Sequence, residues 1–105
     1  MDDITNVISY FADKAKEIYG VNLVKIVLFG SYARNEASDD SDIDLLVVLK
    51  GEIRPSKEID RMIEIIHDTH MKFDFVLQVV PIGERDFKSS KLPLVQNIRQ
   101  EGKNV

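Results

Sequence analysis

The chain has 105 residues, a formal net charge of −4, 44% hydrophobic and 30% charged residues, and no cysteine. This length suits one domain over residues 1–105, and the composition excludes a disordered chain, a disulfide scaffold and a thiolate metal site. The acidic balance argues against extensive nucleic-acid binding, which normally requires a basic surface. We also expect a cytoplasmic protein without membrane attachment. No apolar run approaches the ~20 residues of a membrane span, and the acidic start Met1-Asp2-Asp3 is unlike a signal peptide.

Helical and strand-like hydrophobic patterns alternate along the chain. Apolar residues that recur every three to four positions are typical of an amphipathic helix, whereas a short continuous run rich in Val, Leu and Ile is typical of a buried strand. In chain order, the predicted elements are a helix over residues 2–19, a strand over 23–29, a helical turn over 32–37, a strand over 42–49, a helix from 55 to about 70, a strand over 73–80, and helices over 84–90 and 92–101.

Glycine and proline mark the ends of these elements. Gly20 follows the first helix, Gly51 follows the second strand, and Pro55 suits the first turn of the next helix. Pro81 is expected to stop the third strand. Three strands interleaved with helices imply a small layered α/β domain. The short connections allow antiparallel as well as parallel pairing, so the residues alone leave the strand pairing open.

Two aspartates at the start of the second predicted strand are the strongest chemical feature. Side chains alternate between the faces of a strand, so Asp42 and Asp44 point the same way, roughly 7 Å apart along the backbone, while Ile43 points into the core. Their like charges repel each other, and a divalent cation would offset that repulsion. Mg²⁺ typically binds one or two carboxylates together with substrate phosphates. Taken alone, however, the pair is better explained as two solvated aspartates.

A Gly-Ser step at the end of the first predicted strand is a second feature. Gly30 allows a phosphate to approach the backbone closely, and Ser31 offers a hydroxyl donor beside the amide groups of the following helical turn. Taken alone, this step is a simple turn with a helix cap, since Ser is a good N-cap residue. Ten residues separate Ser31 from Asp42, and the two features together are far more specific than either one.

The segment from Leu28 to Val48 closely resembles the signature of the nucleotidyltransferase superfamily that includes DNA polymerase beta. It reads Leu28-Phe29-Gly30-Ser31-Tyr32-Ala33-Arg34, then a spacer of ten residues counted from Ser31, then Asp42-Ile43-Asp44-Leu45-Leu46-Val47. The short length makes the chain look like the minimal nucleotidyltransferase (MNT) family, and the resemblance extends through the third strand to residues 97–102. It implies the small nucleotidyltransferase fold of the α+β class, with a three-stranded mixed sheet flanked by helices.

The resemblance also implies a set of acidic site residues. The family has a third carboxylate on a neighbouring strand, and the match in this chain is Asp74. Asp42, Asp44 and Asp74 would then be the catalytic residues and would together hold Mg²⁺, as a pair of ions. Asp74 would also take the proton from the acceptor hydroxyl.

The same resemblance implies how the nucleotide is held. Gly30 and Ser31 would bind the β- and γ-phosphates of ATP, the substrate. Arg34 is placed to add a phosphate contact, although a solvent-exposed loop arginine is an equally good interpretation. For Tyr32, packing on a base and simple covering of the loop are equally good interpretations.

The reaction implied by the resemblance is transfer of AMP from ATP to a hydroxyl group of a protein acceptor. Minimal nucleotidyltransferases of this kind typically pair with a helical HEPN-domain ribonuclease in a toxin–antitoxin module. This chain would therefore be the antitoxin, in a hetero-oligomer with its partner. Two alternatives stay open. One is a non-catalytic antitoxin that sequesters the HEPN protein, and the other is an enzyme that modifies a small molecule, as the aminoglycoside nucleotidyltransferases do with the help of an additional domain.

Overall fold

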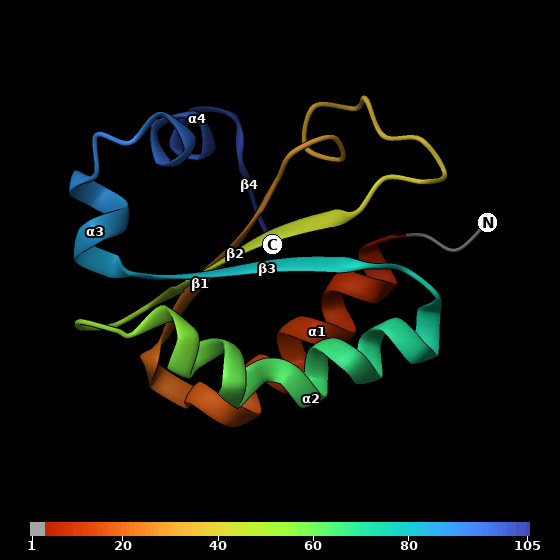
Figure 1. The fold of residues 1–105 in the computed structure, drawn as a ribbon, viewed down its shortest axis with the longest axis horizontal. Helices are drawn as coiled ribbons and strands as arrows, with labels where there is room; N and C mark the ends of the chain where they lie inside the picture. The colour runs from red at the N-terminus through yellow and green to blue at the C-terminus, as the bar shows by residue number, and fades with distance from the viewer. Residues whose placement is uncertain (1–3) are drawn as a thin grey trace.

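The structure is a computed structural model that describes residues 4–105. Helices and short strands alternate along the chain (Figure 1). In order, the elements are α1 (Ile4–Tyr19), the short 3₁₀ helix η1 (Gly20–Asn22), β1 (Leu23–Phe29), β2 (Ile43–Leu49), α2 (Pro55–Phe73), β3 (Leu77–Gly83), α3 (Glu84–Ser89), α4 (Pro93–Glu101) and β4 (Lys103–Asn104). The predicted helix start at residues 2 and 3 lies outside the described residues. None of the helices within residues 4–105 combines the length and apolar character that a membrane span needs.

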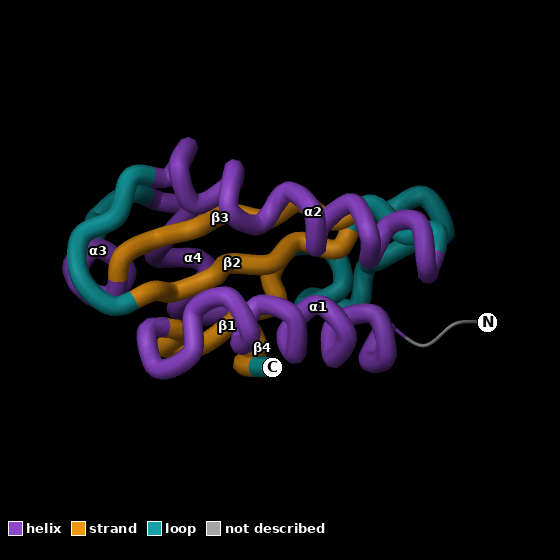
Figure 2. The backbone as a smooth tube through the Cα atoms, turned by 90° about the horizontal axis from the view of Figure 1, so that it is seen from below, coloured by secondary structure: helices purple, strands orange, loops and turns teal. Residues whose placement is uncertain are grey.

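One mixed sheet of four strands organises the chain, in the order β3-β2-β1-β4. β1 runs antiparallel to both β2 and β4, while β2 and β3 are parallel. Parallel pairing requires a crossover between the two strands, and α2 supplies it, as the tube in Figure 2 shows. The mixed α+β sheet flanked by helices is therefore confirmed. The fourth strand, which the resemblance did not predict, is a two-residue segment that pairs with Val27 and Leu28 of β1.

The helices cover the two faces of the sheet in pairs (Figure 1). α1 and α2 pack on one face, where Ile43 and Leu45 of β2 are fully buried. α3 and α4 pack on the other face, over Leu46 and Val48. Successive residues of β2 thus point to opposite faces. The side chain of Asp44 accordingly lies on the face of the sheet that α3 and α4 cover. It precedes the apolar residues Leu46 and Val48, which point to that face further along β2.

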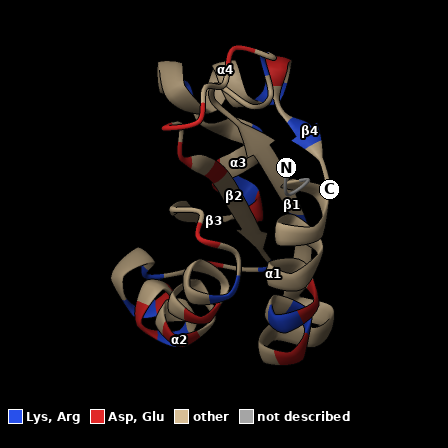
Figure 3. Cartoon of the chain, turned by 90° about the vertical axis from the view of Figure 1, so that its right-hand side faces the viewer, with Lys and Arg blue, Asp and Glu red and all other residues tan. Residues whose placement is uncertain are grey.

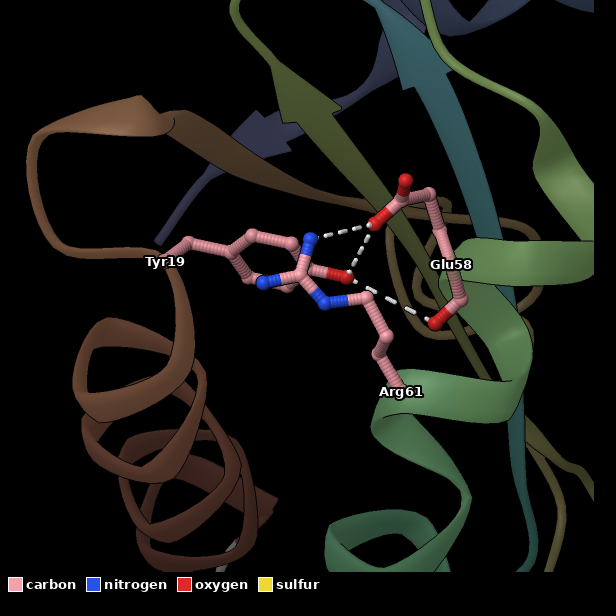
Figure 4. A network of polar contacts seen from close by, with 3 residues as sticks. All are labelled: Tyr19, Glu58 and Arg61. Atoms are coloured by element: carbon pink, nitrogen blue, oxygen red, sulfur yellow. Dashed lines mark hydrogen bonds and ion pairs between the residues drawn. The ribbon is translucent and has the colours of Figure 1, made fainter.

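A polar network joins α1 to α2 (Figure 4). The Tyr19 hydroxyl donates a hydrogen bond to Oε1 of Glu58 at 2.9 Å, and Nη1 of Arg61 lies 3.3 Å from the same oxygen. The Arg61 guanidinium also lies over the Tyr19 ring, 4.8 Å from its centroid. Glu58 is only 8% exposed, so these partners offset the free-energy cost of burying its charge. Burial, together with the hydrogen bond to Glu58, raises the pKa of Tyr19 well above its ordinary value.

The third strand begins later than the sequence predicted. Residues 71–73 continue α2, and Phe73 packs edge-on against Tyr10 of α1 with the ring centroids 5.6 Å apart. β3 then runs from Leu77 through Pro81 to Gly83. The predicted strand over residues 73–80, with Pro81 as its stop, is therefore wrong at both ends. Pro81 is tolerated because β3 is an edge strand of the sheet, where one side makes no ladder bonds.

Candidate active site

The two predicted carboxylates lie next to each other at the start of β2. Asp44 is the second residue of β2, Asp42 directly precedes the strand, and both side chains are half-buried. Across the sheet, Asp44 is the register partner of Phe29 in β1 and of Gln78 in β3. The pair therefore lies at the edge of the sheet where β1 ends and β2 begins. Phe29 of β1 flanks Asp44 on one side, and Gln78 of β3 flanks it on the other.

Gly30 is in contact with Asp44, and the contact leaves no room for a side chain at position 30. Its φ is +74°, in the left-handed region that favours glycine. A Cβ atom there would collide with Oδ2 of Asp44 and would lie 3.0 Å from its carboxyl carbon. The Gly-Ser step and the aspartate pair, which are separated in the sequence, thus form one site.

The segment between Gly30 and Asp42 is closed by local hydrogen bonds. The Gly30 carbonyl accepts the N–H of Arg34 at 3.2 Å, which closes the predicted helical turn. Nearer to Asp42, the N–H of Ser41 donates to the Ser38 carbonyl at 3.0 Å, and the Ser41 hydroxyl oxygen accepts the N–H of Ser38 at 2.9 Å. These bonds stabilise a compact loop whose two ends meet at the site.

The aspartate pair carries negative charge that no ion pair neutralises. Burial raises the pKa of Asp44, the charge of Asp42 raises it further, and the positive charge of Arg34 acts in the opposite direction. Arg34 itself pairs with Glu36, with Nε 3.1 Å from Oε2. Among the described residues, no basic side chain lies within ion-pair distance of Asp42 or Asp44. Such an uncompensated pair of carboxylates favours a bound cation.

The third polar side chain of the site is Gln78, which the sequence analysis missed. Its side-chain amide Nε2 donates a hydrogen bond to Oδ2 of Asp42 at 3.2 Å, and its backbone is in register with Asp44. Gln78 points to solvent on the same face as Asp44, while its neighbour Leu77 is buried on the opposite face. Correct placement of the strand start at Leu77 would have identified it, because the side chain one residue later must face the other way.

Asp74 lies at the C-terminal end of α2 and not on β3. It is exposed and forms the C-cap of α2, with a left-handed backbone (φ +60°, ψ +35°) and its N–H donating to the His70 carbonyl at 2.8 Å. The prediction that it lies on the third strand is wrong, because α2 runs one turn further than expected. Within residues 4–105, no group of three or more His, Cys, Asp or Glu side chains is arranged to hold a metal ion. The structure therefore brings Asp42 and Asp44 together, and Asp74 does not complete a group of three with them.

The residues present fit a magnesium ion held jointly with a nucleotide. Asp42 and Asp44 offer the hard carboxylate oxygens that Mg²⁺ prefers, and two carboxylates plus phosphates are a usual ligand set for it. The backbone of Gly30, free of a side chain, lies against one of these carboxylates. A phosphate bound at this turn would therefore lie next to the same oxygens that hold the ion.

A small recess adjoins the Gly-Ser step. Its volume is about 200 Å³, and it lies between the end of β1 and helix α4. It is lined by Phe29, Gly30, Arg34, Leu94, Asn97, Ile98 and Glu101. Tyr32, by contrast, packs against the core under α1 and α2, so covering of the loop is the interpretation that its surroundings favour. A larger apolar groove of about 620 Å³ follows α2 and the start of β3, and neither aspartate of the pair lines it.

Among the described residues, the recess beside Gly30 is lined by a single basic side chain, Arg34. In Figure 3 the basic residues are spread over α1, α2 and β4, with acidic residues between them. This distribution agrees with the formal net charge of −4. The site is thus suited to one small anionic ligand neutralised by a metal ion rather than to a long polyanion.

Several known proteins are similar to this chain in sequence. It is 30% identical to the proposed protein adenylyltransferase MJ0141 of Methanocaldococcus jannaschii, over 90% of this chain and 94% of that protein. The proposed protein adenylyltransferase MJ1305 of the same organism is 40% identical over 67% of this chain, but the match spans only 46% of MJ1305. The protein adenylyltransferase MntA of Thermococcus cleftensis is 38% identical over 45% of this chain and 46% of that protein.

Solved structures share the fold. A proposed nucleotidyltransferase from Sulfolobus solfataricus superposes with a TM-score of 0.70 at 20% identity, over 94% of this chain and 76% of that one. A toxin–antitoxin complex with AMP-PNP gives a TM-score of 0.62 at 24% identity, over 90% and 68%. The sequence model of the nucleotidyltransferase domain matches residues 8–103, which include the whole Gly30–Asp44 site. The chain therefore belongs to the nucleotidyltransferase domain family, as a minimal, MNT-type member.

Proposed function

We propose that the chain is an Mg²⁺-dependent protein adenylyltransferase that transfers AMP from ATP to a hydroxyl group of a protein acceptor. The observation that carries this proposal is the contact of Gly30 with the Asp44 carboxylate, beside Asp42, in a member of the nucleotidyltransferase family. The names of the similar M. jannaschii and T. cleftensis proteins support a protein acceptor. The AMP-PNP in a complex of the same fold supports ATP as the nucleotide.

Each residue of the site has a proposed role. Asp42 and Asp44 hold the magnesium, which when bound neutralises negative charge on the triphosphate and on the leaving pyrophosphate. The Ser31 hydroxyl and the amides of the following turn hold the β- and γ-phosphates, and Arg34 adds positive charge nearby. Transfer forms a bond between the acceptor oxygen and the α-phosphorus, breaks the bond from that phosphorus to pyrophosphate, and releases the hydroxyl proton to solvent.

We infer that the acceptor is the toxin of a toxin–antitoxin pair and that it is a HEPN-domain ribonuclease. A mutant toxin–antitoxin complex of MntA and HpeT has a chain with the same fold, at 21% identity and a TM-score of 0.62. T. cleftensis MntA matches this chain over 47 residues. On this proposal the protein works in the cytoplasm as a hetero-oligomer with its toxin, and modification inactivates the ribonuclease.

A second function, neutralisation by binding without transfer, is favoured by one observation. The position on β3 that faces Asp44 carries Gln78, an amide, and not a carboxylate. A side-chain amide accepts no proton at neutral pH, so it cannot serve as a general base. An antitoxin with such a site would turn over slowly.

Incubation with [α-³²P]ATP, Mg²⁺ and the product of the neighbouring gene tests the proposal. We expect label on that protein, and we expect Asp42→Asn and Asp44→Asn to abolish the labelling while their thermal melts remain cooperative. Wild-type labelling by either variant would sink the assignment of the site. Neutralisation of the ribonuclease without any label would instead support the binding function.

A further inference from the structure

Gln78 lies next to both carboxylates of the site. Parallel pairing of β2 with β3 puts its Cα opposite that of Asp44, and its side chain reaches back to Asp42, with Nε2 3.2 Å from Oδ2. Its side chain is exposed, and this hydrogen bond directs its amide towards Asp42. The three side chains therefore form one row across the ends of β2 and β3.

The chemistry of an amide at this position differs from that of an acid. The NH₂ group donates to Asp42 and helps to hold that carboxylate in place, whereas a carboxylate there would repel both aspartates. An NH₂ group also cannot ligate a cation, and the amide carbonyl oxygen is a weaker, neutral ligand. The site consequently offers two anionic ligands, Asp42 and Asp44, and no third one within the described residues.

We propose that Gln78 is a positioning residue that orients Asp42 and restricts the site to a single divalent cation, the one that arrives with the nucleotide. The proposal rests on the proposed nucleotide-binding function. Because the described residues group no third anionic ligand with Asp42 and Asp44, the acceptor hydroxyl would have no metal ion of its own and no adjacent base there. The chain then transfers AMP slowly.

The test replaces the amide by its isosteric acid, Gln78→Glu, and measures metal binding directly. The matched control is Gln96→Glu, which adds the same charge at an exposed position of α4 outside the recess. Native mass spectrometry counts Mn²⁺ bound per chain in the presence of α,β-methylene-ATP, whose α–β bridge resists cleavage. Electron paramagnetic resonance of free Mn²⁺ measures the affinity of the protein without nucleotide.

We expect one Mn²⁺ per chain for the wild type and the control, and two for Gln78→Glu. Without nucleotide, we expect the third carboxylate to tighten Mn²⁺ binding at least about tenfold. Two ions in the wild type, or one in Gln78→Glu, would overturn the proposal. If Gln78→Glu unfolds, Gln78→Asp, with a shorter side chain, decides by the same count.

Failure of the inference can be told apart from failure of the proposed function. A wild-type protein that binds neither Mn²⁺ nor α,β-methylene-ATP refutes nucleotide binding and with it the role of Gln78. Suppose that Mn²⁺ binding by the wild type requires Asp44, but that Gln78→Glu binds the same number of Mn²⁺ ions per chain as the wild type. Only the role of Gln78 is then refuted. A gain of AMP transfer in Gln78→Glu, absent from Gln96→Glu, would add support that a purely structural role does not predict.

Discussion

The carboxylate of Asp44 occupies the space that a side chain on Gly30 would need. Gly30 is therefore constrained twice, by its φ of +74° and by this contact. We predict that Gly30→Ala lowers the free energy of unfolding by more than the roughly 1 kcal/mol expected from a left-handed alanine alone, and that it abolishes nucleotide binding by displacing Asp44. Urea melts and nucleotide titration measure the two effects.

The chain contains a matched control for this substitution. Gly51 has φ +78°, nearly the same as Gly30, but a Cβ atom there would meet nothing within 4 Å. Gly51→Ala should therefore show the backbone cost of about 1 kcal/mol and leave nucleotide binding intact. Equal losses of stability in the two variants would mean that the Asp44 contact contributes nothing.

A second prediction concerns the charge of the aspartate pair. Asp44→Asn keeps the shape of the side chain and removes its repulsion with Asp42, which helps to raise the pKa of Asp44. We expect the variant to melt at a higher temperature than the wild type when no ligand is present. Addition of Mg²⁺-ATP should reverse the order, because a ligand stabilises only the protein that binds it. Calorimetry with and without Mg²⁺-ATP measures the melting temperatures of both proteins. The prediction fails if Mg²⁺-ATP raises the melting temperature of the variant as much as that of the wild type.

A third prediction concerns the network of Tyr19, Glu58 and Arg61. Tyr19→Phe removes the 2.9 Å hydrogen bond to the buried Glu58 carboxylate, and a hydrogen bond to a charged group is worth about 1.5–3 kcal/mol. The pKa of Tyr19 is raised in the folded protein, so the folded state keeps the phenol neutral where the unfolded chain ionises. The contribution of Tyr19 to the free energy of unfolding is thus fully present below about pH 10, the ordinary pKa of tyrosine, and declines above that pH.

Urea unfolding at pH 7 and at pH 11 tests this prediction. The stability difference between wild type and Tyr19→Phe should be largest at pH 7 and smaller at pH 11. Tyr10→Phe is the control, since Tyr10 packs on Phe73 through its ring, which the variant keeps. A difference that stays constant with pH would contradict the assigned protonation of Tyr19.

The main features of the site were predictable because they are local in the sequence. The apolar run before Gly30, the ten-residue spacer and the alternation around Ile43 each depend on a few adjacent residues. Their meeting in space follows from one antiparallel pairing, which sets Phe29 opposite Asp44. Local pattern and tertiary structure therefore agree at this part of the chain.

The residue facing Asp44 on the neighbouring strand was not predictable in the same way. Which side chain faces Asp44 depends on where α2 ends. The contact of Phe73 with Tyr10, which favours one more helical turn, joins residues far apart in the sequence. Pro81 indicated the end of a strand, yet the edge position of β3 allows the strand to continue through it. Both errors moved the predicted strand towards the N-terminus, so that Asp74 was expected on the strand and Gln78 was not considered as a neighbour of Asp44.

The last prediction separates Asp74 from the site. Asp74 holds a left-handed conformation (φ +60°) at the end of α2, where glycine is the preferred residue. Asp74→Gly should therefore raise the free energy of unfolding by roughly 0.5–1 kcal/mol, and it should leave Mn²⁺ binding and AMP transfer unchanged. Asp74→Ala should keep Mn²⁺ binding and AMP transfer, but its free energy of unfolding should fall by about 1 kcal/mol, because alanine is strained in this conformation. Urea melts and Mn²⁺ titrations of both variants make the comparison. Loss of metal binding in both, with the fold intact, would show that Asp74 reaches the aspartate pair after all.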